Sequence, residues 1–418
     1  MNLPLTFQIV IGFIGLILLA IPLSNKRSAI NYKSILLAIG FQILLAFALI
    51  KVPIIIGIFS YLSDGVIALQ ESTNEGATFV FGYLASGETP FVESGQGSSL
   101  IFAFAILPLI LVMSSLTAVL WFWGILPLII RGFSSIFEKI FKIGGPIGLG
   151  ATANIIMGQV EAPLLVRPYL GKMSKKELLI LMTAGMSTVS GSIMIAYVMM
   201  LQPQFVDVNI IQHLVTASIL SIPAAIMYAN IMIPVDSSTD FDAESVPRIY
   251  ESSMDAVTRG TRDGLDIALN VGAILITFIA LVSLLDGILG MLPMVGDAPL
   301  SLQRILGWIF APIVWLMGIP WSEAIEAGKL LGVKTALNEF VAYSQLATIE
   351  NNILSERSML IILYGLCGFA NFSSVGILVS GIGAMAPERK KDLIEISIKA
   401  LVGATLASCM TGLVIGIF

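Results

Sequence analysis

Charged side chains are scarce in this sequence. Only 12% of the 418 residues are Asp, Glu, Lys or Arg, whereas 57% are hydrophobic and the mean hydropathy is +0.95. A soluble domain of this length needs far more charge to cover its surface. We therefore expect an all-α membrane protein that crosses the bilayer several times and exposes most of its apolar side chains to lipid.

Cysteine and histidine are also nearly absent. Cys367 and Cys409 lie in apolar runs and are expected to be packing residues, so no disulfide framework is indicated. His213, the single histidine, is expected to pack or to face the lumen. A Cys/His cluster, a glycine-rich phosphate loop and a basic patch with interleaved aromatics are all lacking. The sequence thus indicates neither an enzyme, an ATP-driven machine nor a nucleic-acid partner, and no cofactor is expected.

Long uncharged runs are present instead, and a helix of about 20 such residues spans the hydrocarbon core. The first run lacks a basic leading segment and a small-residue cleavage site, so it is interpreted as a retained helix. Residues 52–67 are amphipathic enough to lie along an interface. The eight expected spans cover residues 3–24, 34–50, 99–130, 178–206, 208–235, 267–285, 358–387 and 400–418.

Basic residues concentrate in alternate loops. The first loop holds Lys26, Arg27 and Lys33, which places it in the cytoplasm and the N-terminus outside. Every second loop thereafter is also basic, through Arg131, Lys139, Lys142, Lys172, Lys175, Lys176, Arg248, Arg259, Arg262, Arg389, Lys390 and Lys391. The other loops are acidic or neutral, with Asp64, Glu71, Glu75, Glu88 and Glu93. This alternation requires that residues 143–167 and 305–349 enter the membrane without crossing it.

The two re-entrant segments resemble each other. Each is preceded by a helix that starts at a basic residue (Arg131 or Arg304) and ends at a Gly/Pro element, and each contains one glutamate, Glu161 or Glu339. By the loop count they enter from opposite sides, so they are inverted repeats, as in many secondary transporters. The expected domains are an N-terminal scaffold (1–98), a first repeat (99–235) with a hairpin at 146–171, a cytoplasmic connector (236–266), and a second repeat (267–418) with a hairpin at 320–350.

A span with a polar, small-residue break follows each hairpin, at residues 188–192 and 368–374. Irregular backbone at membrane depth is tolerated only where it lines a cavity or is buried in protein. Hairpin tips and helix breaks expose N–H and C=O groups that can hold a polar solute and a cation.

Glu161 and Glu339 are candidates for solute binding, because an ionisable group inside the membrane costs several kcal/mol. The alternative is that each pairs with a basic neighbour at the interface, such as Lys329 or Lys334 for Glu339. Uncharged hydrogen-bonding groups nearby are Asn154, Gln159, Asn371 and Ser374. No Arg or Lys stands at either tip to meet an anion. This set suits a neutral, hydroxyl-rich and amide-bearing solute.

Four blocks in this region resemble bacterial members of the concentrative nucleoside transporter family. They are residues 153–163 (ANI followed by GQVEAP), 268–273 (ALNVGA), 338–343 (NEFVAY) and 366–374 (LCGFANFSS). They lie in the family's order, and the span layout is similar over essentially the whole chain. The resemblance implies a homotrimer with eight spans and two hairpins per subunit. It also implies an elevator-like motion of a transport domain against a trimer scaffold.

The resemblance further implies roles for single residues. Nucleobase contacts are implied for Gln159, Val160, Glu161 and Ile193, and ribose contacts for Glu339, Phe369, Asn371 and Ser374. Sodium ligands are implied at the side chains of Asn154 and Thr188 and at the carbonyls of Met157 and Val189. Oxygen-only ligation suits a hard cation. The family usually has threonine or serine where Val160 stands, so base preference is left open, and it commonly has serine where Thr188 stands, which keeps the hydroxyl.

Three functions are compatible with these observations. The favoured hypothesis is sodium-coupled import of nucleosides (uridine-like, broad) across a bacterial inner membrane. A proton-coupled carrier, with Glu161 or Glu339 binding the proton, is the second. The third is an intramembrane acid/base enzyme or a cation channel, although carboxylates from two opposed hairpins surrounded by amides resemble a binding site more closely. Expected partners are the nucleoside, sodium, membrane lipid and two further copies of the chain.

Overall fold

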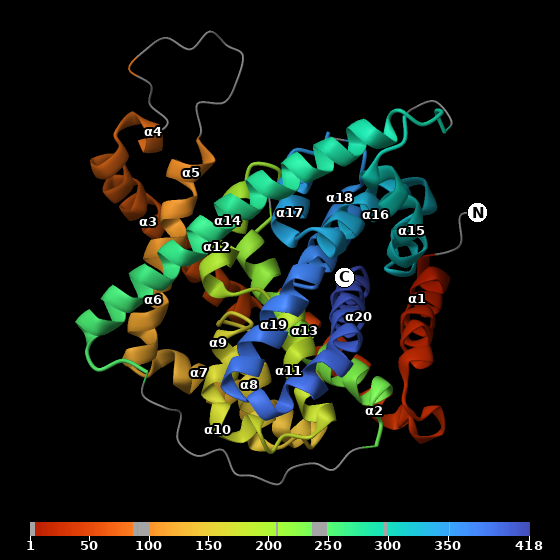
Figure 1. Ribbon diagram of the computed structural model, residues 1–418. Coiled ribbons are helices and arrows are strands. Elements are labelled where there is room, and N and C mark those ends of the chain that lie inside the picture. Colours follow the sequence, from red (N-terminus) through yellow and green to blue (C-terminus); the bar gives the residue numbers. More distant parts are fainter. Residues whose placement is uncertain are drawn as a thin grey trace.

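The chain folds into a bundle of helices (Figure 1). The computed structural model describes residues 5–86, 90, 101–205, 208–235, 249–295, 299–350 and 352–418; Glu88, Glu93 and Arg248 of the expected loops lie outside them. Within this part, eight segments are long and apolar enough to cross a bilayer, which confirms the all-α, multi-pass class. They are Leu5–Leu23, Tyr32–Lys51, Pro53–Phe81, Phe102–Phe122, Lys175–Leu201, Ile210–Met232, Ser253–Leu289 and Pro387–Ile415.

A buried core of helices lies at the centre of the bundle. It consists of α11 (Lys175–Ser187), α13 (Ile210–Met232), α18 (Glu356–Leu366) and α20 (Lys390–Ile415), which pack against one another. Since α13 and α20 are apolar around most of their circumference, they are stable only when protein surrounds them, and 89% and 83% of their apolar windows are buried. Two N-terminal helices lie against this core, α1 (Leu5–Ala20) and α2 (Tyr32–Lys51).

Another group of helices is far more exposed. The long helix α14 (Ser253–Leu289) packs along α6 (Leu107–Phe122) and crosses one side of the molecule in Figure 1. Only 6% of the apolar window of α14 is buried, and the same holds for α3 (Pro53–Phe81). Two short helices, α4 (Tyr83–Ser86) and α5 (Phe102–Ala105), adjoin α3 and α6. The rest of the described chain therefore leaves the apolar surfaces of α3 and α14 largely uncovered.

Two helical hairpins enter this framework, as the sequence predicts. The first follows α7 (Ile125–Phe141) and is built from α8 (Gly145–Ala153), α9 (Glu161–Leu165) and α10 (Arg167–Leu170). The second follows α15 (Leu302–Leu316), which meets the next helix at 116°, and is built from α16 (Trp321–Ala336) and α17 (Glu339–Ala347). The chain reverses at residues 154–160 and 337–338, which brings each predicted glutamate to the first turn of a helix.

Both spans that follow the hairpins are broken where the sequence places a break. Helix α11 gives way to α12 (Gly191–Leu201) and α18 to α19 (Phe372–Met385). The two breaks meet at Gly368, whose φ is +113°, and a Cβ added there would lie 2.6 Å from the carbonyl carbon of Ser187. Only glycine combines this backbone conformation with such a close approach. The breaks of both repeats therefore touch in the core.

Three expected boundaries are wrong. The span at 99–130 ends at Phe122, because Gly124 adopts a left-handed conformation (φ +79°), and α7 begins at Ile125 and not at Arg131. The helix expected at 52–67 continues to Phe81 and is long enough to span. Residues 253–266 of the expected connector belong to α14, a proline-free helix of 37 residues that runs on into the membrane segment. Charge alone does not end a helix when no helix breaker follows it.

A candidate solute site between the two hairpins

A cavity of about 370 Å³ lies where the hairpin tips meet the two breaks. Helix α14 provides another wall, with Asn270 and four apolar residues. All residues predicted for the solute line this one cavity: Gln159, Val160, Glu161, Ile193, Glu339, Phe369, Asn371 and Ser374. Pockets for small organic ligands have volumes of roughly 300–1,000 Å³ and mostly apolar walls with a few placed polar groups. The cavity has this character.

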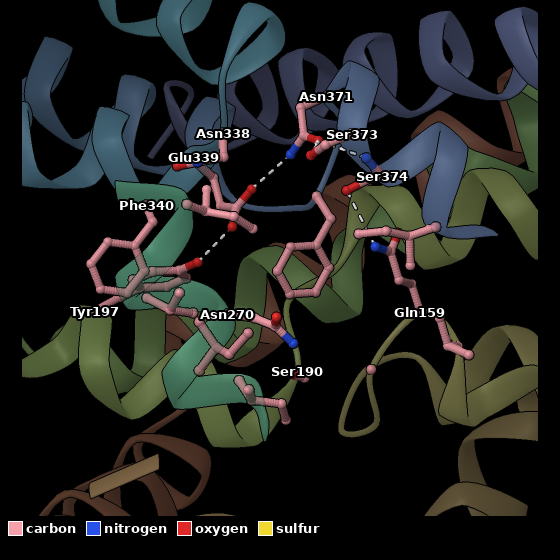
Figure 2. A pocket seen from close by; sticks show the side chains of 18 of the residues that line it. Gln159, Ser190, Tyr197, Asn270, Asn338, Glu339, Phe340, Asn371, Ser373 and Ser374 are labelled. Carbon is pink, nitrogen blue, oxygen red and sulfur yellow. Dashed lines mark hydrogen bonds between the residues drawn. The ribbon is translucent and has the colours of Figure 1, made fainter. Parts of the chain in front are cut away.

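The carboxylate of Glu339 is the most closely held polar group in the cavity. It is 6% exposed at the start of α17, where the side chain of Asn338 caps the helix by accepting from the Val341 N–H at 2.9 Å. One carboxylate oxygen accepts from the Tyr197 hydroxyl at 2.8 Å and the other from the Asn371 amide at 3.0 Å (Figure 2). The helix N-terminus and these donors favour a carboxylate of fixed orientation.

Asn371 and its neighbours connect the two repeats. The side-chain oxygen of Asn371 caps α19 by accepting from the Ser374 N–H at 2.8 Å, which turns its amide nitrogen toward Glu339. The Ser374 hydroxyl in turn accepts from Nε2 of Gln159 at 3.2 Å, across the cavity (Figure 2). Oε1 of Gln159 is buried and has no hydrogen-bond partner within the described residues. An acceptor from the first hairpin is thus free for a ligand.

Glu161 is held locally, and neither glutamate pairs with a basic neighbour in the described part of the chain. A Glu161 carboxylate oxygen accepts from the Gly158 N–H at 3.0 Å. Lys329 pairs with Glu326 at 2.6 Å, and Lys334 donates to two backbone carbonyls. The alternative in which Glu339 pairs with Lys329 or Lys334 is therefore wrong. Its carboxylate is instead arranged by uncharged donors around the cavity.

The four residues predicted for sodium come from two segments in contact. The Ile156 carbonyl, between Asn154 and Met157, accepts from the Gly191 N–H at 2.8 Å, just after Thr188 and Val189. Asn154 is fully buried, and its side-chain oxygen has no hydrogen-bond partner among the described residues. The Thr188 hydroxyl donates to the Ala184 carbonyl at 3.0 Å, so its lone pairs stay free. Buried oxygens without donors are what a hard cation needs.

Some lining residues were not singled out from the sequence. Tyr197 lies in an apolar run that gives no polar signal, and Asn270 lies in one of the four blocks without an assigned role. Asn338, Ser190 and Ser373 complete the polar lining. His213 is not among the lining residues: its Nδ1 lies 2.9 Å from the Tyr364 hydroxyl, which supports a packing role.

Comparison with protein families gives three matches. The model of the Na+ dependent nucleoside transporter C-terminus matches residues 213–416, and that of the Na+ dependent nucleoside transporter N-terminus matches residues 11–84. A model described as nucleoside recognition matches residues 103–204. Together they cover most of the chain, including both hairpins.

The bacterial relatives are similar to this chain in length and sequence, whereas the human relative is longer. An uncharacterized transporter of Haemophilus influenzae is 36% identical over 98% of this chain and 97% of its own. The nucleoside permease NupC of Helicobacter pylori is 34% identical over 98% and 97%. Human solute carrier family 28 member 3 is 32% identical over 97% of this chain and 59% of its own.

Solved structures of CNTnw have the same fold. An inward-facing, substrate-bound structure superposes with a TM-score of 0.89 at 36% identity and covers 99% of this chain and 98% of its own. An outward-facing structure gives a TM-score of 0.90 at 35% identity, over 99% and 97%.

Proposed function

Because this chain belongs to the bacterial concentrative nucleoside transporter family, we propose that it imports nucleosides together with sodium. Members of this family are membrane transporters and not enzymes, so the function shared with the family is nucleoside transport across a membrane. The observation that best supports sodium-coupled import is the cavity between the hairpins, which brings the predicted solute residues together beside the predicted ion residues.

Ribose binding is proposed at Glu339. A carboxylate has about four lone-pair positions, and the protein donates one hydrogen bond to each of its oxygens, from Tyr197 and Asn371. We propose that acceptor positions left on the carboxylate take the 2′- and 3′-hydroxyl groups of a ribose. Phe369 provides an apolar surface beside the sugar. A phosphorylated ligand would bring negative charge next to Glu339 and would be disfavoured.

Nucleobase binding is proposed at the first hairpin. The free Oε1 of Gln159 can accept an N–H of a base, while Nε2 of the same side chain is engaged by Ser374. Ile193 would pack against the face of the base. Val160 contributes only methyl groups, so direct polar selection among bases is weak at this position. We propose a broad specificity that includes uridine.

Sodium is proposed to bind between the first hairpin and the first break, at the Asn154 and Thr188 side chains and the Met157 and Val189 carbonyls. In support, the Asn154 oxygen is buried without a donor and the two segments are in direct contact. The ion would join the tip, which carries Gln159, to the broken span, which carries Ile193. Bound sodium would thereby order one side of the solute cavity.

An elevator-like movement is proposed for the hairpins and broken spans. Apart from α14, the cavity is lined by hairpin and broken-span residues, so the solute would lie at the boundary between these elements and α14. We propose that α14 stays with the scaffold while the hairpins and broken spans carry the solute past it. The expected scaffold (1–98) and first repeat (99–235) remain part of this proposal, whereas the boundary at residue 266 does not, because α14 runs across it.

A homotrimer in the bacterial inner membrane, with the N-terminus outside, completes the proposal. The alternating basic loops support the orientation. The exposed apolar surfaces of α3 and α14 support subunit contacts, because only 6% of the apolar window of each helix is buried within its own chain.

Uptake of radiolabelled uridine into proteoliposomes tests the coupling. We expect uptake when sodium is outside and none when potassium replaces it, with suppression by excess adenosine or cytidine. Uptake that follows an imposed pH step in sodium-free buffer would replace sodium with the proton. Sodium current without added nucleoside would instead indicate a channel.

A further inference from the structure

Lys334 is a buried lysine without a carboxylate partner. Its side chain is 0% exposed, and it lies in the last turn of α16, the first helix of the second hairpin. Its Nζ donates to the Gly365 carbonyl at 2.9 Å and to the Cys367 carbonyl at 3.4 Å. No carboxylate oxygen lies within ion-pair distance of it in the described part of the chain. A buried ammonium group is costly unless something compensates its charge.

The groups that contact the Lys334 ammonium lie at the carboxyl-terminal end of α18, while Glu339, beyond ion-pair distance, adds a longer-range attraction. This helix stops at Leu366, so no following turn supplies the carbonyls at its end with a full set of N–H donors; only the Cys367 N–H turns back, to the Tyr364 carbonyl at 3.1 Å. Carbonyls at a helix C-terminus carry partial negative charge and favour a cation. Two of the carbonyl oxygens at the α18 break face Lys334. A neutral donor, the Ser408 hydroxyl of α20, also reaches the Cys367 carbonyl at 2.8 Å.

The equivalent place in the first repeat has no lysine. There the first hairpin helix, α8, packs against α11, which likewise stops at a break. The groups at this end are the Thr188 hydroxyl and the unpartnered oxygen of Asn154. The two repeats thus bring a hairpin tip to the C-terminal end of a half-span in the same way. At the end of α18 lies the ammonium group of the Lys334 side chain, whereas the end of α11 has side-chain oxygens and no lysine.

We propose that the Lys334 ammonium group is a tethered cation that takes, in the second repeat, the place that the mobile coupling ion takes in the first. The half of this comparison that concerns the first repeat rests on the proposed sodium site. The tethered charge would hold the end of α18 in position, and with it the segment that presents Phe369 and Asn371 to the cavity. Lys334 is then a positioning residue, and a single ion per cycle suffices because the second place is filled permanently.

Removing the side chain tests this directly. Lys334→Ala should leave a cavity beside two carbonyls that a small cation can enter. We expect uridine affinity of this variant to be restored by methylammonium chloride and not by choline chloride. We also expect the Hill coefficient for sodium activation to rise from about 1 in the unaltered protein toward about 2, because a second ion site is created. Unchanged sodium activation without methylammonium rescue would overturn the proposal.

Ser408→Ala is the matched control, because it removes a neutral hydrogen bond from the same Cys367 carbonyl. It should alter neither the Hill coefficient nor the response to methylammonium. If it reproduces the Lys334→Ala behaviour, the effect belongs to the hydrogen bond and the tethered-charge proposal is wrong. Lys334→Met fills the space with an apolar chain, and we expect it to lose affinity without rescue by either cation.

Thermal unfolding of the purified variants in detergent separates this inference from the proposed function. Methylammonium should raise the melting temperature of Lys334→Ala and leave that of Ser408→Ala unchanged, whether or not uptake depends on sodium. If the unaltered protein needs no sodium for uptake but this stabilisation is seen, the sodium proposal fails and the tethered cation stands. If Lys334→Ala gains neither stability nor folded yield from any small cation, the tethered cation fails.

Discussion

The Glu339 carboxylate accepts hydrogen bonds from Tyr197 and Asn371 and lines the cavity. An amide at this position would offer one acceptor oxygen in place of two. It would also turn N–H groups toward Tyr197 or Asn371, so one of the present bonds would be lost or reversed. The proposed ribose contacts depend on this orientation and would weaken with it.

We therefore expect Glu339→Gln to lower uridine affinity by about ten- to a hundredfold, since a hydrogen bond to a charged group contributes about 1.5–3 kcal/mol. Equilibrium binding of uridine to purified protein measures this without requiring transport. Glu326→Gln is the control, because it neutralises a carboxylate that pairs with Lys329 on α16, outside the cavity. Unchanged affinity in Glu339→Gln would remove this residue from the ribose site.

Thr188→Ala addresses the proposed ion site. Loss of one oxygen ligand is expected to raise the half-saturating sodium concentration about tenfold, with a smaller change in uridine affinity at saturating sodium. Thr335→Ala is matched to it, because both hydroxyls donate to the carbonyl four residues earlier, at 3.0 and 2.9 Å, and only Thr188 is a proposed ligand. Equal sodium responses in the two variants would show that Thr188 does not hold the ion.

Residue roles were predictable where a polar side chain interrupts an apolar run. Glu161 and Glu339 stand out for this reason, and both line the cavity. Tyr197 does not, because an aromatic residue in a span is ordinarily a packing residue and only the fold turns its hydroxyl toward Glu339. Lys334 entered the sequence analysis only as an alternative partner of Glu339, whereas its hydrogen-bond partners lie at the end of α18.

At the scale of the elements, the contact between the two breaks constrains the sequence at Gly368. Gly368→Ala would place a Cβ 2.6 Å from the backbone of Ser187 at a φ of +113°. Strain of this kind costs on the order of 1–3 kcal/mol. We expect a lower melting temperature and reduced uridine uptake.

Gly376→Ala, in the middle of α19, is the comparison for this variant. An added Cβ there meets nothing within 4 Å, and alanine favours a helix interior over glycine. Its stability should equal or exceed that of the unaltered protein. Equal melting temperatures for the two alanine variants would contradict the close contact at Gly368.

Helix breaks were predictable, whereas helix lengths were not. A polar, glycine-containing stretch within an apolar run marks both breaks, because unpaired backbone groups in a membrane require a cavity or protein around them. The 37-residue length of α14 depends on its packing along α6, and the charges before residue 267 suggested a separate connector. The turn at Gly124 was hidden within a continuous hydrophobic run.

For the whole molecule, we expect three copies of the 44.7 kDa chain in the detergent-solubilised particle. Light scattering corrected for bound detergent measures this mass. Leu284→Asn on α14 should reduce the trimer fraction, while Leu36→Asn on α2 should not, although these leucines are 64% and 70% exposed. A monomer in the unaltered protein, or equal effects of the two variants, would exclude α14 as a subunit contact.

The contact of Gly368 with Ser187 leaves no space for even one more methyl group. Ser218 of α13 reinforces it, because its hydroxyl accepts from the Val189 N–H at 3.4 Å and lies 3.8 Å from the Cys367 sulfur. The proposed ion site lies at the first break and the proposed sugar site at the second. Because the two breaks are in contact, both sites would move together during transport. Slippage, in which either the ion or the nucleoside crosses alone, would require the two breaks to separate at this close contact. The concentration that the cell can accumulate would then be limited by the driving gradient and not by leakage.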